Sequence, residues 1–218
     1  MRHSPVVRIT HWISTGSVIA LVVSGAAILL AHPRLYWGET GTVGVPSLVD
    51  LPLPFVLTGQ TGWGRSLHFL AAWICVLTGA LYILVGSLTG HFRANLLPSR
   101  GDRSPAAIAR SVRAHLRFAV GREPGRAGYN ALQRLTYSLV VFGLSPLMIW
   151  TGLAMSPAVT SVWPWLVTSL GGHQSARTLH FVGASLVLLF LAVHVTMIAA
   201  TGFVARMRAM TIGVRGQS

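Results

Sequence analysis

The chain has 218 residues, of which 52% are hydrophobic and only 10% are charged, and its mean hydropathy is +0.62. These values are typical of proteins that cross a membrane several times and exclude an ordinary soluble globular protein. The formal net charge is +13, and every basic residue is an arginine, but no nucleic-acid-binding motif accompanies that charge. We therefore expect one membrane domain, residues 1–218, that contacts anionic lipid and no nucleic acid.

Four apolar stretches are long enough to cross the membrane as helices, since about 20 residues span its hydrocarbon core of ~30 Å. The first exceeds the 7–15 apolar residues of a signal-peptide core, so we expect it to be retained. None is divided by the turn residues that separate strands, which argues against a β-barrel. The sequence predicts an all-α membrane protein, a bundle of four transmembrane helices. The stretches cover residues 11–31, 66–87, 135–155 and 178–203.

The connections between these stretches differ in composition. Residues 32–65 are rich in glycine and proline and contain tyrosine and tryptophan, which is typical of an ordered loop at a membrane interface. In the middle connection, Ser104 and Pro105 form a helix start. The residues that follow predict a short amphipathic helix on the membrane surface. Its apolar face is formed by Ile108, Val112, Leu116 and Ala119.

The distribution of arginine predicts the orientation. Only Arg34, Arg65 and Arg177 lie in the first and third connections, whereas the other fourteen lie near the termini or in the middle connection. Loops rich in arginine stay in the cytoplasm. Both termini and the middle connection are therefore predicted to be cytoplasmic.

A short pattern occurs at three of the stretches, in which an arginine is followed three residues later by a histidine and then by an aromatic residue. It covers residues 8–12, 65–69 and 177–181. At this spacing both side chains share one helix face, with the arginine one turn nearer water. A histidine that only filled space would not need this partner.

The fourth stretch contains two histidines, His180 and His194, which lie fourteen residues apart. On an α-helix this is a rise of about 21 Å and lies within about 40° of four full turns, so both imidazoles point the same way at different depths. An ionisable side chain in apolar surroundings is costly unless it pairs or binds something. The pattern favours ligands over packed structural histidines.

Haem fits this arrangement, since its axial positions take neutral imidazoles from facing helices and its propionates suit arginine. By depth, His68 and His180 are predicted to ligate one haem on the outer side. His11 and His194 are predicted to ligate a second haem on the cytoplasmic side. The predicted propionate-binding residues are Arg8, Arg65 and Arg177.

Other metal sites fit less well. Zinc gathers three or four ligands at one depth, often with cysteine or carboxylate, whereas these histidines come in pairs at two depths. Covalent c-type haem needs a C-x-x-C-H motif, and Cys75 is the single cysteine. Two non-covalent b-type haems are therefore predicted.

A third group of residues lies on the predicted cytoplasmic side. His91 follows the second stretch at the depth of the second haem, and Arg134 and Tyr137 lie near the start of the third. Titratable groups near haem and water suit proton-coupled quinone chemistry. We hypothesise that these residues border a quinone site, the alternative being that they are ordinary interfacial residues.

These motifs, with five further segments, resemble the prokaryotic cytochrome b561 family. Its members are four-helix membrane cytochromes that include the b subunits of nickel–iron hydrogenases and of thiosulfate reductase and other molybdenum oxidoreductases. The resemblance covers nearly the whole chain. It implies electron transfer across the bacterial inner membrane, between the quinone pool and a periplasmic redox partner such as a molybdenum oxidoreductase. The further segments are residues 32–38, 67–73, 90–92, 129–133 and 151–157.

Two other functions stay open. An autonomous oxidoreductase would pass electrons between quinone and a small oxidant or reductant such as superoxide or ferric ion, and Arg34, Arg65 and Arg177 would favour an anion. A passive anchor or small-solute transporter would use the histidines structurally, although we find neither inverted repeats nor broken helices. A conduit needs no catalysis of its own, so the sequence leaves open whether the chain is an enzyme.

Overall fold

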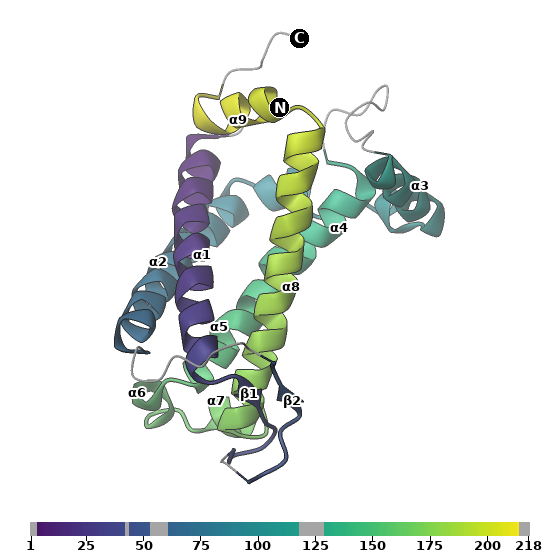
Figure 1. Ribbon diagram of the computed structural model, residues 1–218. Helices are drawn as coiled ribbons and strands as arrows, with labels where there is room; N and C mark the ends of the chain where they lie inside the picture. The colour runs from purple at the N-terminus through teal and green to yellow at the C-terminus, as the bar shows by residue number, and fades with distance from the viewer. Residues whose placement is uncertain (1–3, 42–43, 53–60, 118–128, 214–218) are drawn as a thin grey trace. The chain divides into compact units, whose positions relative to one another are not determined.

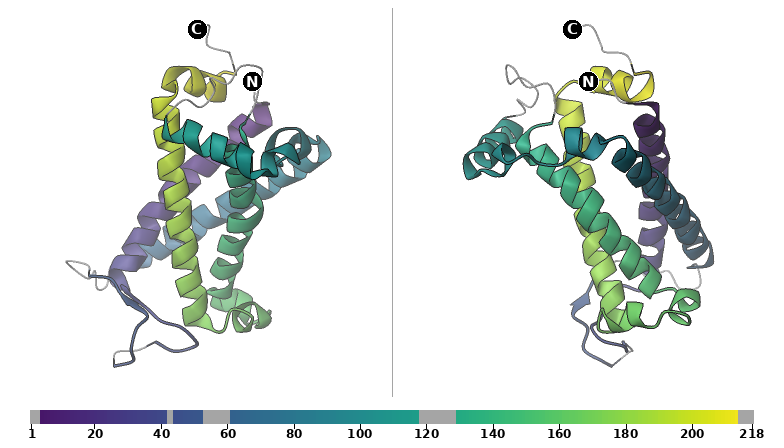
Figure 2. Two further views of the ribbon diagram at one scale, coloured as in Figure 1. Left: turned by 90° about the vertical axis from the view of Figure 1, so that its right-hand side faces the viewer. Right: turned by 180° about the vertical axis from the view of Figure 1, so that it is seen from behind.

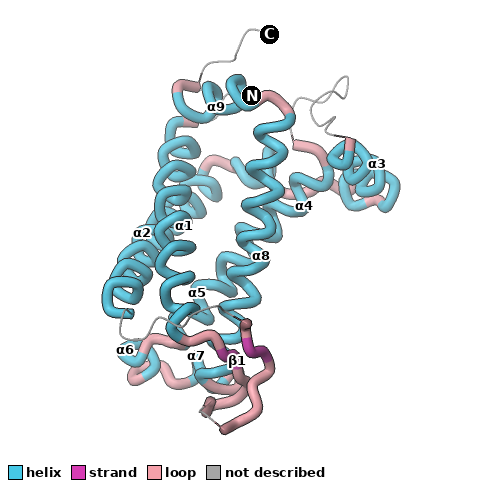
Figure 3. The backbone as a smooth tube through the Cα atoms, in the orientation of Figure 1, coloured by secondary structure: helices cyan, strands magenta, loops and turns pink. Residues whose placement is uncertain are grey.

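The computed structural model describes residues 4–41, 44–52, 61–117 and 129–213. Most of this part of the chain is helical (Figures 1 and 3). Four of its helical segments are long and apolar enough to cross a membrane, which confirms the prediction of four membrane-length helices. They are Pro5–Ala31, Gly62–Leu88, Ala131–Ala154 and His173–Ala200.

Each of these segments begins four to six residues before the predicted start. The reason is the same in every case. An arginine falls within the added residues and lowers the local hydropathy, although the backbone there is already helical. These arginines are Arg8, Arg65, Arg134 and Arg177.

The third membrane helix is not uniform. It consists of α4 (Ala131–Leu139), the π-helix η3 (Val140–Leu144) and α5 (Ser145–Ala154). Pro146 has no N–H group, so the α-helical bond to the carbonyl of Phe142 cannot form, and a wider turn accommodates the interruption. The sequence analysis did not predict this π-helix.

The chain forms two compact units. The His68 unit comprises residues 12–79 and 145–186, and the His194 unit comprises residues 1–11, 80–144 and 187–218. The long helices α1 (Pro5–Ala31), α2 (Thr61–Leu88) and α8 (His173–Ala200) each contribute one part to either unit. The units are therefore not consecutive sequence domains, and the single domain stays a prediction.

At one end of the His68 unit, short elements surround the start of α8 (Figure 1). They are the antiparallel strands β1 (Arg34–Leu35) and β2 (Val49–Asp50) and the short helices α6 (Pro157–Thr160) and α7 (Trp165–Thr168). A small apolar core joins α5, α7 and α8 there. It contains Ala154, Leu166, Val167 and Ala176.

The loop after β1 caps the first turn of α8. The carbonyl of Gly38 accepts a hydrogen bond from Gln174 N at 2.9 Å, and Gly38 N donates to Ser175 Oγ at 2.8 Å. Thr178 Oγ1 donates to the carbonyl of Tyr36 at 2.6 Å. The bond from Gln174 satisfies one of the N–H groups that a helix start leaves unpaired, and the other two bonds tie side chains of α8 to the loop. They also fix the helix that carries His180.

In the His194 unit, a run of short helices follows α2. They are η1 (Phe92–Leu96), η2 (Gly101–Arg103) and α3 (Pro105–Leu116), and α9 (Phe203–Thr211) follows α8. The predicted amphipathic helix is confirmed as α3, whose N-cap Ser104 accepts a hydrogen bond from Ala107 N. It lies beside α4 (Figure 2). Its predicted apolar residues Val112 and Leu116 are exposed, and Ala119 lies outside the described residues.

Candidate functional site

The histidines of α2 and α8 meet inside the His68 unit. The ring centres of His68 and His180 are 6.2 Å apart, and the ring planes are inclined by 64°. The two residues lie more than a hundred positions apart in the sequence, and depth in the membrane was the reason for pairing them. The structure brings this predicted pair together.

Each of these imidazoles is held by a hydroxyl group from another helix. Ser24 Oγ on α1 lies 3.0 Å from His68 Nδ1. Thr151 Oγ1 on α5 lies 2.8 Å from His180 Nδ1. In both rings the Nδ1 atom is therefore occupied, and Nε2 is the nitrogen left for a metal.

A glycine follows each hydroxyl residue and faces the same ring. A Cβ atom placed on Gly25 would lie 3.6 Å from His68 Cε1, and one placed on Gly152 would lie 3.6 Å from His180 Cε1. In both cases the histidine ring provides the only atoms within 4 Å among the described residues. Each glycine therefore lets its histidine ring pack close to the helix backbone.

This geometry fits a haem. A b-type haem takes two imidazole ligands from neighbouring helices, and His68 and His180, whose ring centres are 6.2 Å apart, would hold its iron. Among the described residues no group of three or more histidine, cysteine or acidic side chains could hold a metal ion, so a pair is what the site offers.

The His194 unit surrounds its histidine with aromatic rings. The His194 ring stacks on Phe190 at 5.5 Å between centres and contacts the edge of Tyr137 at 6.1 Å. His11 and Arg206 lie within electrostatic range of His194. A cavity of about 80 Å³ is lined in part by Tyr137, Phe190, His194 and Arg206. This unit therefore holds the second predicted pair, His11 and His194.

A comparison with protein families decides the identity. The family described as prokaryotic cytochrome b561 matches residues 2–213, nearly the whole chain. The chain belongs to this family. It is a multi-pass membrane cytochrome of the b type, as the resemblance implied.

Two relatives are similar to this cytochrome over most of its length. A putative protein-methionine-sulfoxide reductase subunit, YedZ1, of Azospira oryzae is 29% identical over 90% of this chain and 89% of its own length. A probable nickel–iron hydrogenase B-type cytochrome subunit of Cupriavidus necator is 28% identical over 87% of this chain and 74% of its own length. No solved structure gives a significant match. Both relatives are described as subunits of oxidoreductases.

In this cytochrome the arginines of the repeated pattern bind backbone carbonyls or lie exposed. Arg8 Nη1 donates to the carbonyl of Thr211 at 2.9 Å, and Arg177 Nη2 donates to the carbonyl of His32. Arg65 is exposed. Their predicted contact with haem propionates stays a prediction.

The three residues of the hypothetical quinone site have separate surroundings in the cytochrome. His91 contacts the edges of Tyr82 and Phe92, at 6.0 and 5.9 Å between ring centres, and partial burial lowers its pKa. Tyr137 lies against His194 instead. Within the described part of the chain, no hydrogen bond or ring contact joins His91 to Arg134 or Tyr137.

Arg134 has a clear structural role. It donates to the carbonyls of Tyr129 and Leu97 at 3.3 and 3.2 Å. Its Nε also lies 3.9 Å from the carboxylate of Asp102, which is buried and accepts hydrogen bonds from Ser99. Arg134 thus ties the segment after η1 to the start of α4.

Several residues around the histidines were not predicted from the sequence. Ser24 and Thr151 could have been found, because both are hydroxyl residues followed by glycine within membrane helices at the depth of the outer pair. The aromatic and cationic residues near His194 could not have been found, because their positions depend on how α4, α8 and α9 pack. Those residues are Tyr129, Phe190 and Arg206.

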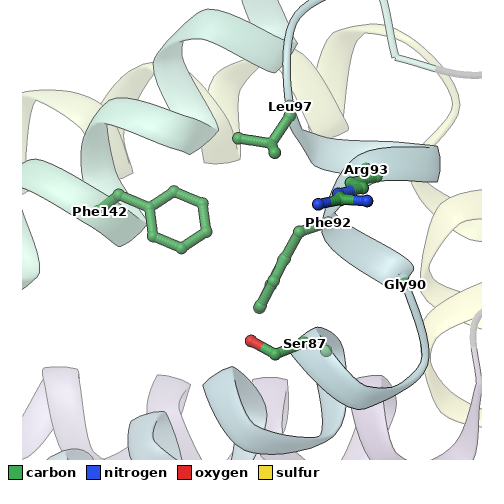
Figure 4. A pocket seen from close by; sticks show the side chains of 7 residues that line it. Ser87, Gly90, Phe92, Arg93, Leu97 and Phe142 are labelled. Carbon is green, nitrogen blue, oxygen red and sulfur yellow. The ribbon is translucent and has the colours of Figure 1, made fainter.

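The cytochrome also has a larger cavity, which the sequence analysis did not predict. Its volume is about 540 Å³, and it lies in the His194 unit (Figure 4). The rings of Phe92 and Phe142 form apolar walls, and Arg93 provides a positive charge. Gly86 leaves room for the ring of Phe92, since a Cβ there would lie 2.4 Å from it.

Proposed function

We propose that this cytochrome carries electrons across the membrane through two b haems, between the quinone pool and a redox partner on the outer side. The observation that carries the proposal is the His68–His180 pair, whose ring centres are 6.2 Å apart. A second histidine on α8, His194, lies fourteen residues further along the helix, a rise of about 21 Å. One helix thus provides a ligand to each of two sites.

The roles of the residues follow from this arrangement. His68 and His180 would hold one haem, and His11 and His194 the other. A bound b-type haem supplies a one-electron redox centre. Ligation requires neutral imidazoles, and apolar surroundings suit that form. Arg8, Arg65 and Arg177 are the proposed contacts of the propionates.

Quinone chemistry is proposed for the His194 unit, on the cytoplasmic side, bordered by His91, Arg134 and Tyr137. Its support is the titratable ring of His91, which lies against Tyr82 and Phe92 and outside the membrane-spanning segment. A quinol releases two protons when it is oxidised, so a group that accepts protons near water suits this site. If His91→Ala leaves quinone-dependent haem reduction at its normal rate, this part of the proposal is wrong.

An oxidoreductase is the proposed outer partner. The relative named as a methionine-sulfoxide reductase subunit matches over nearly its whole length. The hydrogenase cytochrome subunit supports the same general arrangement. A periplasmic molybdenum enzyme is the kind of partner that we propose, and substrate chemistry would take place there and not in this chain.

Transfer across the membrane can be tested in proteoliposomes that contain ferricyanide on the inside. When dithionite is added outside, we expect the internal ferricyanide to be reduced in vesicles with the cytochrome and not in protein-free vesicles. His68→Ala and His194→Ala should each abolish the transfer. If haem-loaded vesicles leave the ferricyanide oxidised, the conduit is contradicted. If the purified chain alone turns over quinol with superoxide or ferric ion, the outer partner is unnecessary.

A further inference from the structure

The contacts of His68 and His180 are built in the same way. Each Nδ1 faces a hydroxyl oxygen, Ser24 Oγ at 3.0 Å and Thr151 Oγ1 at 2.8 Å. Each hydroxyl residue is followed by a glycine whose Cα faces the same ring. The arrangement thus occurs twice, once between α1 and α2 and once between α5 and α8.

The direction of these hydrogen bonds follows from a second set of contacts. Ser24 Oγ donates to the carbonyl of Ala20 at 2.7 Å, and Thr151 Oγ1 donates to the carbonyl of Leu147 at 2.8 Å. A hydroxyl has one proton and two lone pairs. Since the proton is committed to the helix backbone, the oxygen can only accept from the histidine. The hydrogen must therefore be on Nδ1, and the lone pair must be on Nε2.

The burial of Ser24 and Thr151 supports this assignment of the histidine tautomer. Ser24 and Thr151 are both 0% exposed, so water does not compete for either oxygen. A buried N–H group is destabilising when it loses a hydrogen-bond acceptor. The alternative tautomer would place a lone pair against an oxygen whose proton points away.

We propose that Ser24 and Thr151 are positioning residues that hold His68 and His180 in the tautomer that binds iron through Nε2. This inference rests on the proposed function, since it requires these histidines to ligate a haem. A group that accepts a hydrogen bond from the second nitrogen of a ligand histidine fixes the ring and raises its basicity. The more basic ligand favours oxidised iron, so the two hydroxyls lower the potential of this haem.

A back-bonded hydroxyl alone does not make such a contact. Ser17 lies on α1 seven residues before Ser24, is also buried, and donates to the carbonyl of Ile13 at 2.9 Å. No histidine hydrogen bonds to Ser17 among the described residues. Ser17→Ala is therefore a matched control, because it removes the same backbone contact without affecting a ligand.

The test uses the full-length haem-loaded protein and the variants Ser24→Ala and Thr151→Val. We expect each to weaken binding of the His68–His180 haem by about 10- to 100-fold and to raise its midpoint potential. A tenfold change in the preference for oxidised over reduced iron corresponds to about 59 mV for one electron. Ser24→Thr and Thr151→Ser keep the hydroxyl and should restore wild-type behaviour, and Ser17→Ala should match the wild type.

Haem content and redox titration are the readouts, and the other haem serves as an internal reference. If Ser24→Ala and Thr151→Val bind haem and titrate like the wild type, the positioning role is wrong. If the variants do not fold, histidine ¹⁵N NMR of the reduced wild type decides: a hydrogen on Nδ1 of both residues supports the role, and its absence overturns it. A wild type without haem, or a His68→Ala variant that keeps both haems, contradicts the proposed function instead.

Discussion

Several arginines of this cytochrome donate hydrogen bonds to carbonyl groups at the ends of helices. Arg177 donates to the carbonyl of His32 just after α1, Arg8 to that of Thr211 at the end of α9, and Arg134 to that of Leu97 after η1. The last carbonyls of a helix lack backbone partners and carry partial negative charge. An arginine has five donors and is always charged. The sequence does not reveal these contacts, because the carbonyls are distant in the chain, and the predicted cofactor contacts of these arginines stay predictions.

Arg177 and Arg65 provide a matched pair for testing this role. We expect Arg177→Gln to lower the stability of the protein by about 1–3 kcal/mol, because it leaves a charged hydrogen bond unmade. Arg65 is exposed, so Arg65→Gln should change stability by less than about 0.5 kcal/mol. Thermal unfolding in detergent measures both. Equal destabilisation by the two variants would contradict the assignment, and equal loss of haem would favour propionate binding by both.

We expect His32 to make the stability of the protein depend on pH. Burial is the main cause that lowers its pKa, and the cations Arg177 and Arg65 lower it further. In the unfolded chain the pKa is about 6.5, so as the pH falls through that value the unfolded state takes up a proton first. Stability should therefore decrease as the pH falls below about 6.5, until the folded pKa is reached.

The measurement is the unfolding temperature between about pH 5 and pH 8, for the wild type and for His32→Gln. The variant should lose stability less steeply on acidification. A curve for His32→Gln that runs parallel to the wild type would show that His32 does not contribute.

At the scale of elements, apolar length and cap residues predicted the helices well. The four membrane helices and α3 follow from local sequence, since about twenty apolar residues or a Ser-Pro start specify them directly. The π-helix η3 and the strands β1 and β2 were not predicted. A wide turn next to Pro146 and a pair of two-residue strands depend on packing with distant segments, which leaves little pattern in the sequence.

Two glycines of α2 test how closely its end packs on η1. A Cβ on Gly86 would lie 2.4–2.8 Å from the ring of Phe92, whereas one on Gly79 would have no neighbour within 4 Å among the described residues. That ring is also held by Tyr82 and Phe142, at 5.3 and 5.2 Å between centres. We expect Gly86→Ala to destabilise the protein by about 1–3 kcal/mol through overpacking.

Gly79→Ala is the control for this prediction, and it should be neutral or stabilising by up to about 1 kcal/mol because alanine favours a helix. Thermal unfolding compares the two variants. The account of this contact fails if Gly86→Ala unfolds at the same temperature as Gly79→Ala or higher.

At the scale of the whole molecule, each compact unit contains one of the two predicted histidine pairs. Helical rise converts sequence spacing into depth, which is how the sequence suggests these pairs. The aromatic rings around His194 could not be predicted, because they come from helices whose packing the spacing does not specify, whereas the hydroxyl residues Ser24 and Thr151 could have been found. Candidate histidine pairs thus leave a clearer pattern in the sequence than the residues that surround them.

The central claim is that four histidines hold two b haems in separate pairs. It is tested most directly by the haem content and the reduced-minus-oxidised spectrum of the purified wild type and of four alanine variants. We expect two haems in the wild type, loss of the same one in His68→Ala and His180→Ala, and loss of the other in His11→Ala and His194→Ala. A wild type that is colourless after expression with ample haem, or a crossed pattern of loss among the variants, would contradict the account.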